Sequence, residues 1–189
     1  MKPGVRAVGI AESYAGDRRR GDSSTIAGAV VRADRVVDGL AFTSCTVGGT
    51  DATGAIRTLL SRLDREDVRY VLVAGIAPAW YNVLDLRAIA EAVDRPVLSV
   101  SFEASEGLEP ALKREFSDDE LSERLDTYRR QPARERLTVN GETVFVRRVG
   151  LDDGAPEVVR AFTPEGGRPE PLRIARTAAR AADQFRADS

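Results

Sequence analysis

The feature that most constrains the fold of this chain is the order in which its apolar segments follow one another. Three strand-like runs come first, at residues 5–11, 24–32 and 36–47, and a turn at residues 33–35 joins the last two. Helical and strand-like runs then alternate as far as residue 102. Consecutive strands with short connections favour an antiparallel meander, whereas strands joined through helices are parallel. The order therefore predicts a mixed sheet.

The period of each later run identifies its type. In the segment that begins at Thr50-Asp51, apolar residues repeat at i, i+4, i+7, i+8 and i+11, which is one face of a helix. Residues 68–74 are continuously apolar apart from Arg69, as expected for a strand covered on both faces. A second helix and a strand at residues 96–102 follow. The apolar faces of the two helices consist of Ala52, Ile56, Leu59, Leu60 and Leu63, and of Leu86, Ile89, Ala90 and Val93.

The expected fold class is α/β, with an RNase H-like mixed sheet: an antiparallel three-strand meander extended by parallel strands and flanked by helices. One domain over residues 1–189 is the default for this length. The charged sequence of residues 106–130 predicts a helical insert that is broken near residues 117–119. Residues 136–148 predict a hairpin, because Asn140-Gly141 favours a type I′ turn. Helices are expected at residues 155–162 and after Pro171.

Composition excludes several kinds of site. The chain has no histidine, which removes Ser-His-Asp and Cys-His nucleophile systems and histidine zinc sites. The single cysteine, Cys45, excludes an internal disulfide and is expected to be a buried small side chain. The net charge of −2 gives no global attraction to nucleic acid, so such binding needs a local basic patch. Without a membrane-length apolar run or a signal-peptide layout, the expected location is cytoplasmic.

Four segments carry a family resemblance. They are VGIAESY at residues 8–14, VGGTDAT at residues 47–53, PEPLRIA at residues 169–175 and a looser match at residues 74–85. Together they resemble an uncharacterised, mainly archaeal family catalogued as domain of unknown function 99, itself similar to endonuclease V. The anchors span nearly the whole chain in the family's order. The resemblance implies an endonuclease V-like variant of the RNase H-like fold.

The departures from the family pattern bear on catalysis. Relatives similar to endonuclease V carry Asp where the first and fourth strands end, and these positions are Ala11 and Ala74 here. Glu12 matches the second acidic position, but neighbours on a strand point to opposite faces, so it cannot replace a side chain at Ala11. Gly48 stands where relatives often have Asp, and Arg176 where they have His. Two-metal hydrolysis needs Asp or Glu to hold the ions. We therefore expect no bound metal and no cofactor.

Three carboxylates are candidates for catalysis. Glu12 ends the first strand beside the expected cleft, and the alternative is a solvated loop carboxylate. Asp51 is a natural N-cap, whose carboxylate accepts backbone N–H bonds at a helix start, and the alternative is a retained metal or substrate contact. Asp85 either caps the second helix or joins the other two around one Mg²⁺ or Mn²⁺ ion.

The candidates for the binding cleft surround the same segments. Trp80 and Tyr81 follow the fourth strand, where they either stack on a base or pack over the adjacent helix. Glu170 and Arg173 are three residues apart and can form an ion pair that braces the last helix. The remaining candidates are Tyr14, Thr50, Thr53 and Asn82. The hydroxyl groups of the two threonines can order the turn at residues 48–49, and Asn82 can cap the second helix.

Basic runs at residues 18–20, 129–130 and 147–148 either contact phosphates or are solvated. Arg147 and Arg148 cannot form one patch, since they face opposite sides of a strand.

Three functions stay open. The leading one is an endonuclease V-like domain that is catalytically degenerate and keeps a cleft for nucleic acid or a nucleotide. The second is a divalent-metal-dependent nuclease with a rearranged carboxylate set. The third is a protein-interaction module that uses the charged insert. The sequence does not determine the substrate or the oligomeric state.

Overall fold

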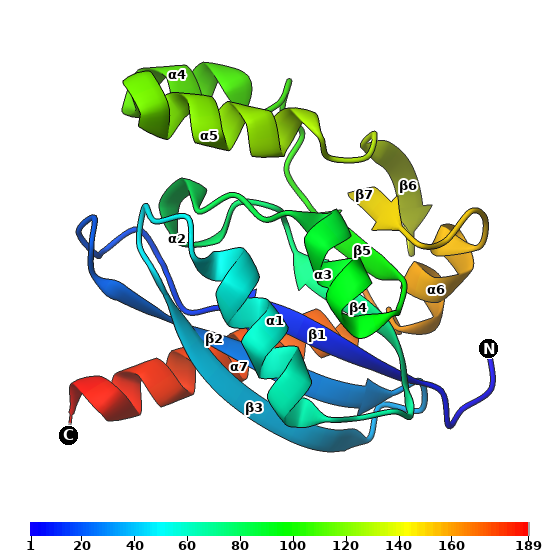
Figure 1. Cartoon of the computed structure of the whole chain (residues 1–189). Coiled ribbons are helices and arrows are strands. Elements are labelled where there is room, and N and C mark those ends of the chain that lie inside the picture. Colours follow the sequence, from blue (N-terminus) through cyan, green and yellow to red (C-terminus); the bar gives the residue numbers. More distant parts are fainter. Residues whose placement is uncertain (189) are drawn as a thin grey trace.

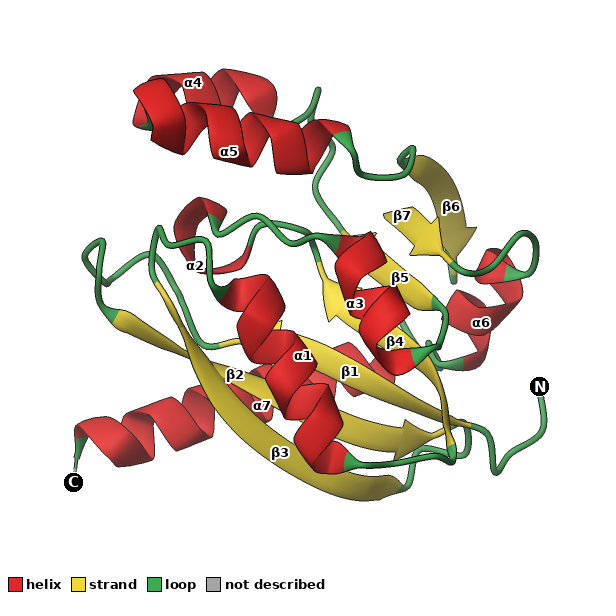
Figure 2. Ribbon diagram, in the orientation of Figure 1, coloured by secondary structure: helices red, strands yellow, loops and turns green. Residues whose placement is uncertain are grey.

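A computed structural model describes residues 1–188 and shows one mixed sheet of seven strands within them, with helices on both of its faces (Figures 1 and 2). The strands run in the order β3-β2-β1-β4-β5-β7-β6. β1 pairs in parallel with β4, β4 pairs in parallel with β5, and every other neighbouring pair is antiparallel. The strands are β1 (Arg6–Glu12), β2 (Ser23–Arg32), β3 (Val37–Thr46), β4 (Val68–Ala74), β5 (Val97–Ser101), β6 (Glu135–Val139) and β7 (Glu142–Val149). The predicted meander with parallel strands is confirmed.

The helices divide between the two faces. α1 (Ala52–Leu63) and α3 (Leu86–Val93) cover one face, and α7 (Glu170–Ala187) crosses β1 and β2 on the other (Figure 2). α4 (Glu109–Glu115) and α5 (Asp118–Arg129) are the two helices expected of the charged insert, and they lie over the short α2 (Pro78–Tyr81). α6 (Ala155–Ala161) packs beside β6. Within residues 1–188, no helix combines the length and the apolarity that crossing a membrane requires.

The hairpin at residues 135–149 forms as predicted and does more than decorate the core. Asn140 and Gly141 have φ values of 49° and 84°, the left-handed conformations of a type I′ turn. β7 pairs with β5 from Val97↔Val149 to Ser101↔Phe145, so the hairpin adds two strands to the main sheet. The sequence pattern did not indicate this continuation, because antiparallel pairing to a distant strand leaves no local signal.

The two faces of the sheet are packed differently. The α1 and α3 side buries branched aliphatic residues, including Ile26, Ile56 and Leu59. The α7 side near β1 and β2 buries mainly small residues, among them Ala11, Ala29 and Ala175. Small residues let a helix axis approach a sheet closely, so α7 lies tight against the centre of the sheet.

The tightest contact is between β1 and the start of α7. A Cβ atom built on Gly9 would lie 2.2 Å from both the carbonyl carbon and the carbonyl oxygen of Pro171, and 2.7 Å from the backbone nitrogen of Leu172. These are backbone atoms, which cannot rotate away. Gly9 therefore lets the PEPLR segment pack directly on β1, and two of the sequence motifs meet at this point.

We predict that Gly9→Ala destabilises the protein severely, because the added methyl group forces α7 away from β1. The expected loss is about 3 kcal/mol or more in the free energy of unfolding, or roughly 6 to 12 °C in Tm. The matched control is Gly54→Ala in α1, where no atom lies within 4 Å of the new Cβ. The control should gain up to about 1 kcal/mol, since alanine is the better helix former. Similar melting curves for the two variants would contradict the account.

Candidate functional site

Ala11 and Ala74 lie side by side where two parallel strands end. β1 and β4 pair in register as far as Ile10↔Val73, and these two alanines follow directly. Both side chains pack in the small-residue cluster under Ala175 of α7. Both also line a cavity of about 30 Å³, together with Glu12 and Arg176. The predicted placement on adjacent strands facing one cleft is confirmed, and neither side chain carries a ligand atom.

Glu12 leaves β1 on the face opposite Ala11, although its side chain lines the same strand-end cavity and is affected by the charge of Arg176. Its cross-strand neighbour Ile26 belongs to the core under α1. The Glu12 carboxylate accepts a hydrogen bond from the backbone N–H of Tyr14 and another, 2.9 Å long, from the Ser24 hydroxyl. Burial raises the pKa of Glu12, and this effect is opposed by the two hydrogen bonds, by the charge of Arg176 and by the backbone N–H of Ala79. Glu12 therefore does not take over the direction of Ala11, and Tyr14 itself packs against the α1-side core.

Asp51 stands at the N-cap position of α1, but its carboxylate accepts no hydrogen bond from the first turn of the helix. The predicted capping hydrogen bond is therefore wrong. Its carboxylate turns back to accept the Thr46 N–H at 3.0 Å, the Thr46 hydroxyl at 2.8 Å and the Asn82 amide at 2.7 Å. Partial burial raises the pKa of Asp51, but these hydrogen bonds outweigh it and bring the pKa below its ordinary value. Asp51 closes the turn at the end of β3.

Asn82 caps α1 rather than the helix that follows it, which corrects the prediction. It is fully buried, and its side-chain oxygen accepts the Ala52 N–H of α1 at 3.0 Å. Its amide donates to the Thr46 carbonyl at 2.9 Å. Of the two residues predicted to cap α3, only Asp85 does so. Its carboxylate accepts hydrogen bonds from the backbone N–H groups of Arg87 and Ala88.

The two threonines predicted to order the turn at residues 48–49 lie in different surroundings. Thr53 acts one helix away, where its hydroxyl accepts the Asp85 N–H at 3.0 Å, so this part of the prediction is wrong. Thr50 is exposed.

Trp80 and Tyr81 stand on a left-handed turn. Ala79, Trp80 and Tyr81 have φ values of 46°, 56° and 61°, a conformation that costs roughly 1–2 kcal/mol per residue. The Trp80 ring lies 5.3 Å from the ring of Phe116, and the Tyr81 ring lies 6.2 Å from it. The two aromatic residues therefore pack against the α4–α5 insert, which favours packing over base stacking.

Arg124 of α5, which the sequence analysis did not single out, holds this turn. Its side chain is 3% exposed and donates to the carbonyl of Gly48 at 2.6 Å and to that of Tyr81 at 3.3 Å. It also lies 3.9 Å above the Phe116 ring, and burial lowers the pKa of Arg124. The i, i+4 spacing of apolar residues in the insert was the available signal for a buried face. That face consists of Leu112 in α4, Phe116 directly after α4, and Leu121 and Leu125 in α5.

Other predicted side chains are tied to structural partners. Glu170 and Arg173 form the expected i, i+3 ion pair at the start of α7. Arg18 pairs with Asp183 and Arg20 with Glu120, so this basic run is not free. Cys45 is buried as predicted, and burial raises the pKa of its thiol to about 12, with smaller effects from the charges of Asp51 and Glu12. The thiol stays protonated at neutral pH.

A pocket of about 220 Å³ opens where β4 and β5 end, one residue beyond Ala74. Its walls include Gly75, Ser99 and Tyr128, and three charged residues, Glu103, Arg134 and Arg147, also line it. Burial and the charge of Arg147 lower the pKa of Arg134. Ligands of open α/β sheets bind at the carboxyl ends of strands. The pocket has this position, and Arg134 and Arg147 in its wall already donate to the backbone carbonyls of Ser105, Glu103 and Pro132.

A second basic group lies on and before α7. Arg176 and Arg180 are one helical turn apart, and within residues 1–188 neither forms a salt bridge. Their charges, after burial, lower the pKa of Arg168, so the three guanidinium groups are close enough to repel one another. Such a group is stabilised by a bound polyanion.

The acidic side chains near the strand ends do not form a cluster of metal ligands in residues 1–188. Among the described residues, no three His, Cys, Asp or Glu side chains converge on one point. Hard cations such as Mg²⁺ bind oxygen ligands. Proteins usually supply one or two carboxylates, and water or substrate oxygens complete the shell. Glu12 and Asp51 point into separate hydrogen-bond networks.

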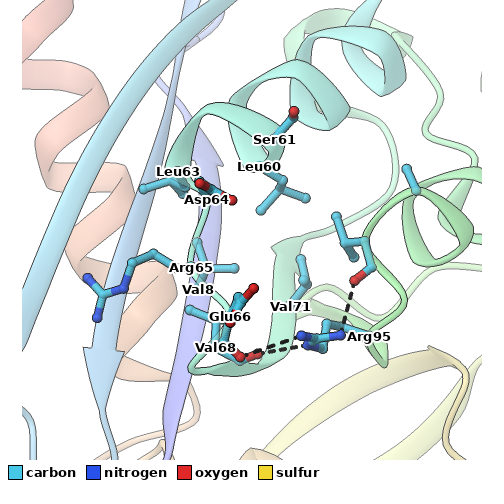
Figure 3. A pocket seen from close by; sticks show the side chains of 12 residues that line it. Val8, Leu60, Ser61, Leu63, Asp64, Arg65, Glu66, Val68, Val71 and Arg95 are labelled. Carbon is cyan, nitrogen blue, oxygen red and sulfur yellow. Dashed lines mark hydrogen bonds between the residues drawn. The ribbon is translucent and has the colours of Figure 1, made fainter.

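A cavity of about 240 Å³ lies near the other end of the sheet, between the ends of α1 and α3 (Figure 3). Val8, Val68 and Val71 form its floor. Arg95 at its rim donates to the Val68 carbonyl at 3.1 Å and to the Asp94 carbonyl at 2.7 Å, so this cation is engaged. None of the predicted site residues lines the cavity.

Comparison with known proteins gives a consistent family. The model of the family described as Endonuclease dU matches residues 3–183. A UPF0215 protein of Pyrobaculum aerophilum is 34% identical over 181 residues, which covers 94% of each chain. A UPF0215 protein of Thermococcus kodakarensis is 30% identical over 181 residues, covering 93% of this chain and 90% of the relative.

Solved structures share the fold. A protein of unknown function from Archaeoglobus fulgidus superposes with a TM-score of 0.79 at 23% identity, covering 94% of this chain and 97% of that one. Ciona intestinalis endonuclease V, in complex with DNA containing an inosine, gives a TM-score of 0.62 at 12% identity, covering 95% and 86%. Streptomyces avermitilis endonuclease V gives 0.59 at 19% identity, covering 98% and 84%.

We predict that Glu12→Gln stabilises the protein at neutral pH. The hydrogen bonds from Tyr14 and Ser24 go to one carboxylate oxygen, so the glutamine carbonyl can accept both, and the variant has no charge to bury. Below pH 4.5, wild-type Glu12 is protonated in both states, and its ionisation costs nothing. As pH rises from there through the raised folded pKa, wild type loses stability that the variant keeps.

Melting temperatures measured from pH 4 to pH 8 test this. The gap between Glu12→Gln and wild type should widen with pH, whereas the exposed control Glu66→Gln should show no such widening. A constant gap would mean that the Glu12 carboxylate is not penalised by burial.

Proposed function

The chain belongs to the Endonuclease dU family, and from this premise we propose that it is an endonuclease V-like protein that binds nucleic acid without two-metal hydrolysis. The resemblance to an uncharacterised archaeal, endonuclease V-like family is thereby confirmed. The observation that carries the proposal is the pair of strand ends. Ala11 and Ala74 lie next to each other on parallel strands, where ligand carboxylates would have to converge.

The acidic residues nearby do not compensate. A two-metal site stabilises the attacking and leaving oxygens through ions held by carboxylates. Glu12 accepts hydrogen bonds from Tyr14 and Ser24, Asp51 holds the turn after β3, and Asp85 caps α3. Freeing any of them breaks local structure. These contacts argue against the rearranged carboxylate site.

Two features support nucleic-acid binding. Arg168, Arg176 and Arg180 form a basic group beside the strand ends, and arginine binds phosphate through paired N–H donors. The pocket after β4 is somewhat smaller than the roughly 300–1,000 Å³ typical of drug-sized ligands, which suits a single base or phosphate. The Ciona intestinalis enzyme, which shares the fold, is described in complex with DNA.

The α4–α5 insert provides less support for an interaction module. Its apolar residues face inward onto Trp80, Tyr81 and Val83, which leaves charged side chains outside. A solvated charged face needs no partner to be stable.

We predict that purified wild-type protein does not nick inosine- or uracil-containing DNA with Mg²⁺ or Mn²⁺, but binds a fluorescent single-stranded oligonucleotide in a salt-dependent way. The double variant Arg176→Glu/Arg180→Glu should weaken binding by about tenfold or more, because it removes two phosphate contacts and adds repulsion. Fluorescence anisotropy measures the affinity.

The matched control is Arg57→Glu/Arg62→Glu, which makes the same charge change on exposed positions of α1. An equal loss of affinity in both variants would mean that only the net charge matters and that the basic group is not a binding site. Metal-dependent nicking that Glu12→Gln or Asp51→Asn abolishes would replace the proposal with a working rearranged nuclease.

A further inference from the structure

β3 forms one edge of the sheet (Figure 1). Two of its large apolar side chains are exposed. Leu40 and Phe42 are 48% and 45% exposed, and both lie on the α7 side, opposite Ala29 and Ala27 of β2. Exposed edge strands in stable monomers are blunted by charged residues, proline or short length. β3 has ten residues, no proline and one charge, at Asp38.

The hydrogen bonds at the end of β3 show which backbone groups face outward. Val47 donates to Asp22 at 2.8 Å and accepts from Gly21 at 2.9 Å, so its N–H and C=O point toward the β2 side. Successive residues of a strand alternate in this direction. The register with β2 is regular from Ser24↔Cys45 to Val30↔Gly39, so the alternation holds throughout. The N–H and C=O groups of Leu40, Phe42 and Ser44 therefore point away from the sheet.

Both ends of this open edge are closed by side chains. The outward N–H of Thr46 donates to the Asp51 carboxylate at 3.0 Å. The outward carbonyl of Asp38 accepts a hydrogen bond from Arg65 at 2.8 Å. The open stretch thus runs from Leu40 to Ser44 and is symmetric about Phe42, with no charged residue in it.

We propose that this stretch pairs with a second copy of the same chain, as an antiparallel strand pair with its twofold axis at Phe42. In this register, Phe42 lies opposite Phe42 of the second copy, and Leu40 opposite Ser44. The three outward donors of each copy meet the three outward acceptors of the other, so every open group is used. Shifting the register by two residues leaves open groups facing Asp38 or Thr46, whose outward groups are already bonded.

The side chains agree with self-pairing. The two copies of Phe42 form an aromatic cross-strand pair, flanked by the two copies of Leu40 on the same face. The only charged residue of β3, Asp38, falls opposite Thr46 and not opposite another carboxylate. An isologous interface requires such self-complementarity. The paired sheets would run continuously through both copies, with the strand-end clefts free.

Sedimentation equilibrium on the whole chain tests the proposal. The mass should rise with concentration toward twice the chain mass of 20.5 kDa. Ser44→Pro removes an outward N–H without touching the β2 ladder, and it should halve the mass at high concentration. Ser44→Ala, which keeps the N–H, should remain dimeric. Phe42→Lys places two cations together at the axis and should also give monomers.

Controls separate this edge from general stickiness. Val36→Lys changes an equally exposed valine outside the open stretch and should leave the dimer intact. Amide exchange at Leu40, Phe42 and Ser44 should be slow in wild type and fast in folded Phe42→Lys. A wild-type mass that stays at one chain at every concentration overturns the proposal. Dimers that persist in both Ser44→Pro and Phe42→Lys, each folded by circular dichroism, also overturn it.

Discussion

Pro171, at the start of α7, lies against the backbone of Gly9 so closely that no side chain fits between them. This contact fixes where α7 crosses the sheet, and α7 in turn covers the ends of β1 and β4. The small-residue cluster around Ala175 and the position of Arg176 beside the strand-end cavity both follow from it. The same close approach means that any side chain at Ala11 is held between β1 and α7. The space available to side chains at the ends of β1 and β4 therefore depends on how the start of α7 packs on β1 at Gly9.

The acidic residues near these strand ends have structural partners. Asp51, with Asn82, joins the end of β3 to the start of α1, and this junction supports a left-handed turn at Trp80. Arg124 reaches the same junction from α5 and satisfies carbonyl groups that the turn leaves open. A buried cation bound to neutral carbonyl groups is costly to remove, because the vacated acceptors stay buried. The insert is thus part of the architecture around the cleft. Its charged outer surface concealed this in the sequence.

The elements and their order were predictable because helical and strand periods are local signals, and most observed ends differ from the predicted ones by one or two residues. The adjacency of Ala11 and Ala74 was also predictable, since parallel strands end at one edge of a sheet. The partners of Asp51 and Asn82 were not. Their hydrogen bonds cross from β3 to the loop after β4, and residue type cannot distinguish a carboxylate that caps its own helix from one that turns back. Arg134 and Arg147 were missed as pocket residues for the same reason, because only the tertiary fold brings the end of β5 beneath α5.

The central claim is that the strand ends lost a metal site when they became alanines while the backbone kept its course. Isothermal titration of Mn²⁺ into wild type and into Ala11→Asp/Ala74→Asp tests this most directly. Two added carboxylates on adjacent strands should converge at the cavity and bind the ion with water completing its shell. The account predicts negligible heat for wild type and saturable binding near one ion per chain for the folded double variant, with a Tm that rises on adding Mn²⁺. Saturable binding by wild type, or equal negligible heats for wild type and a well-folded double variant, would contradict it.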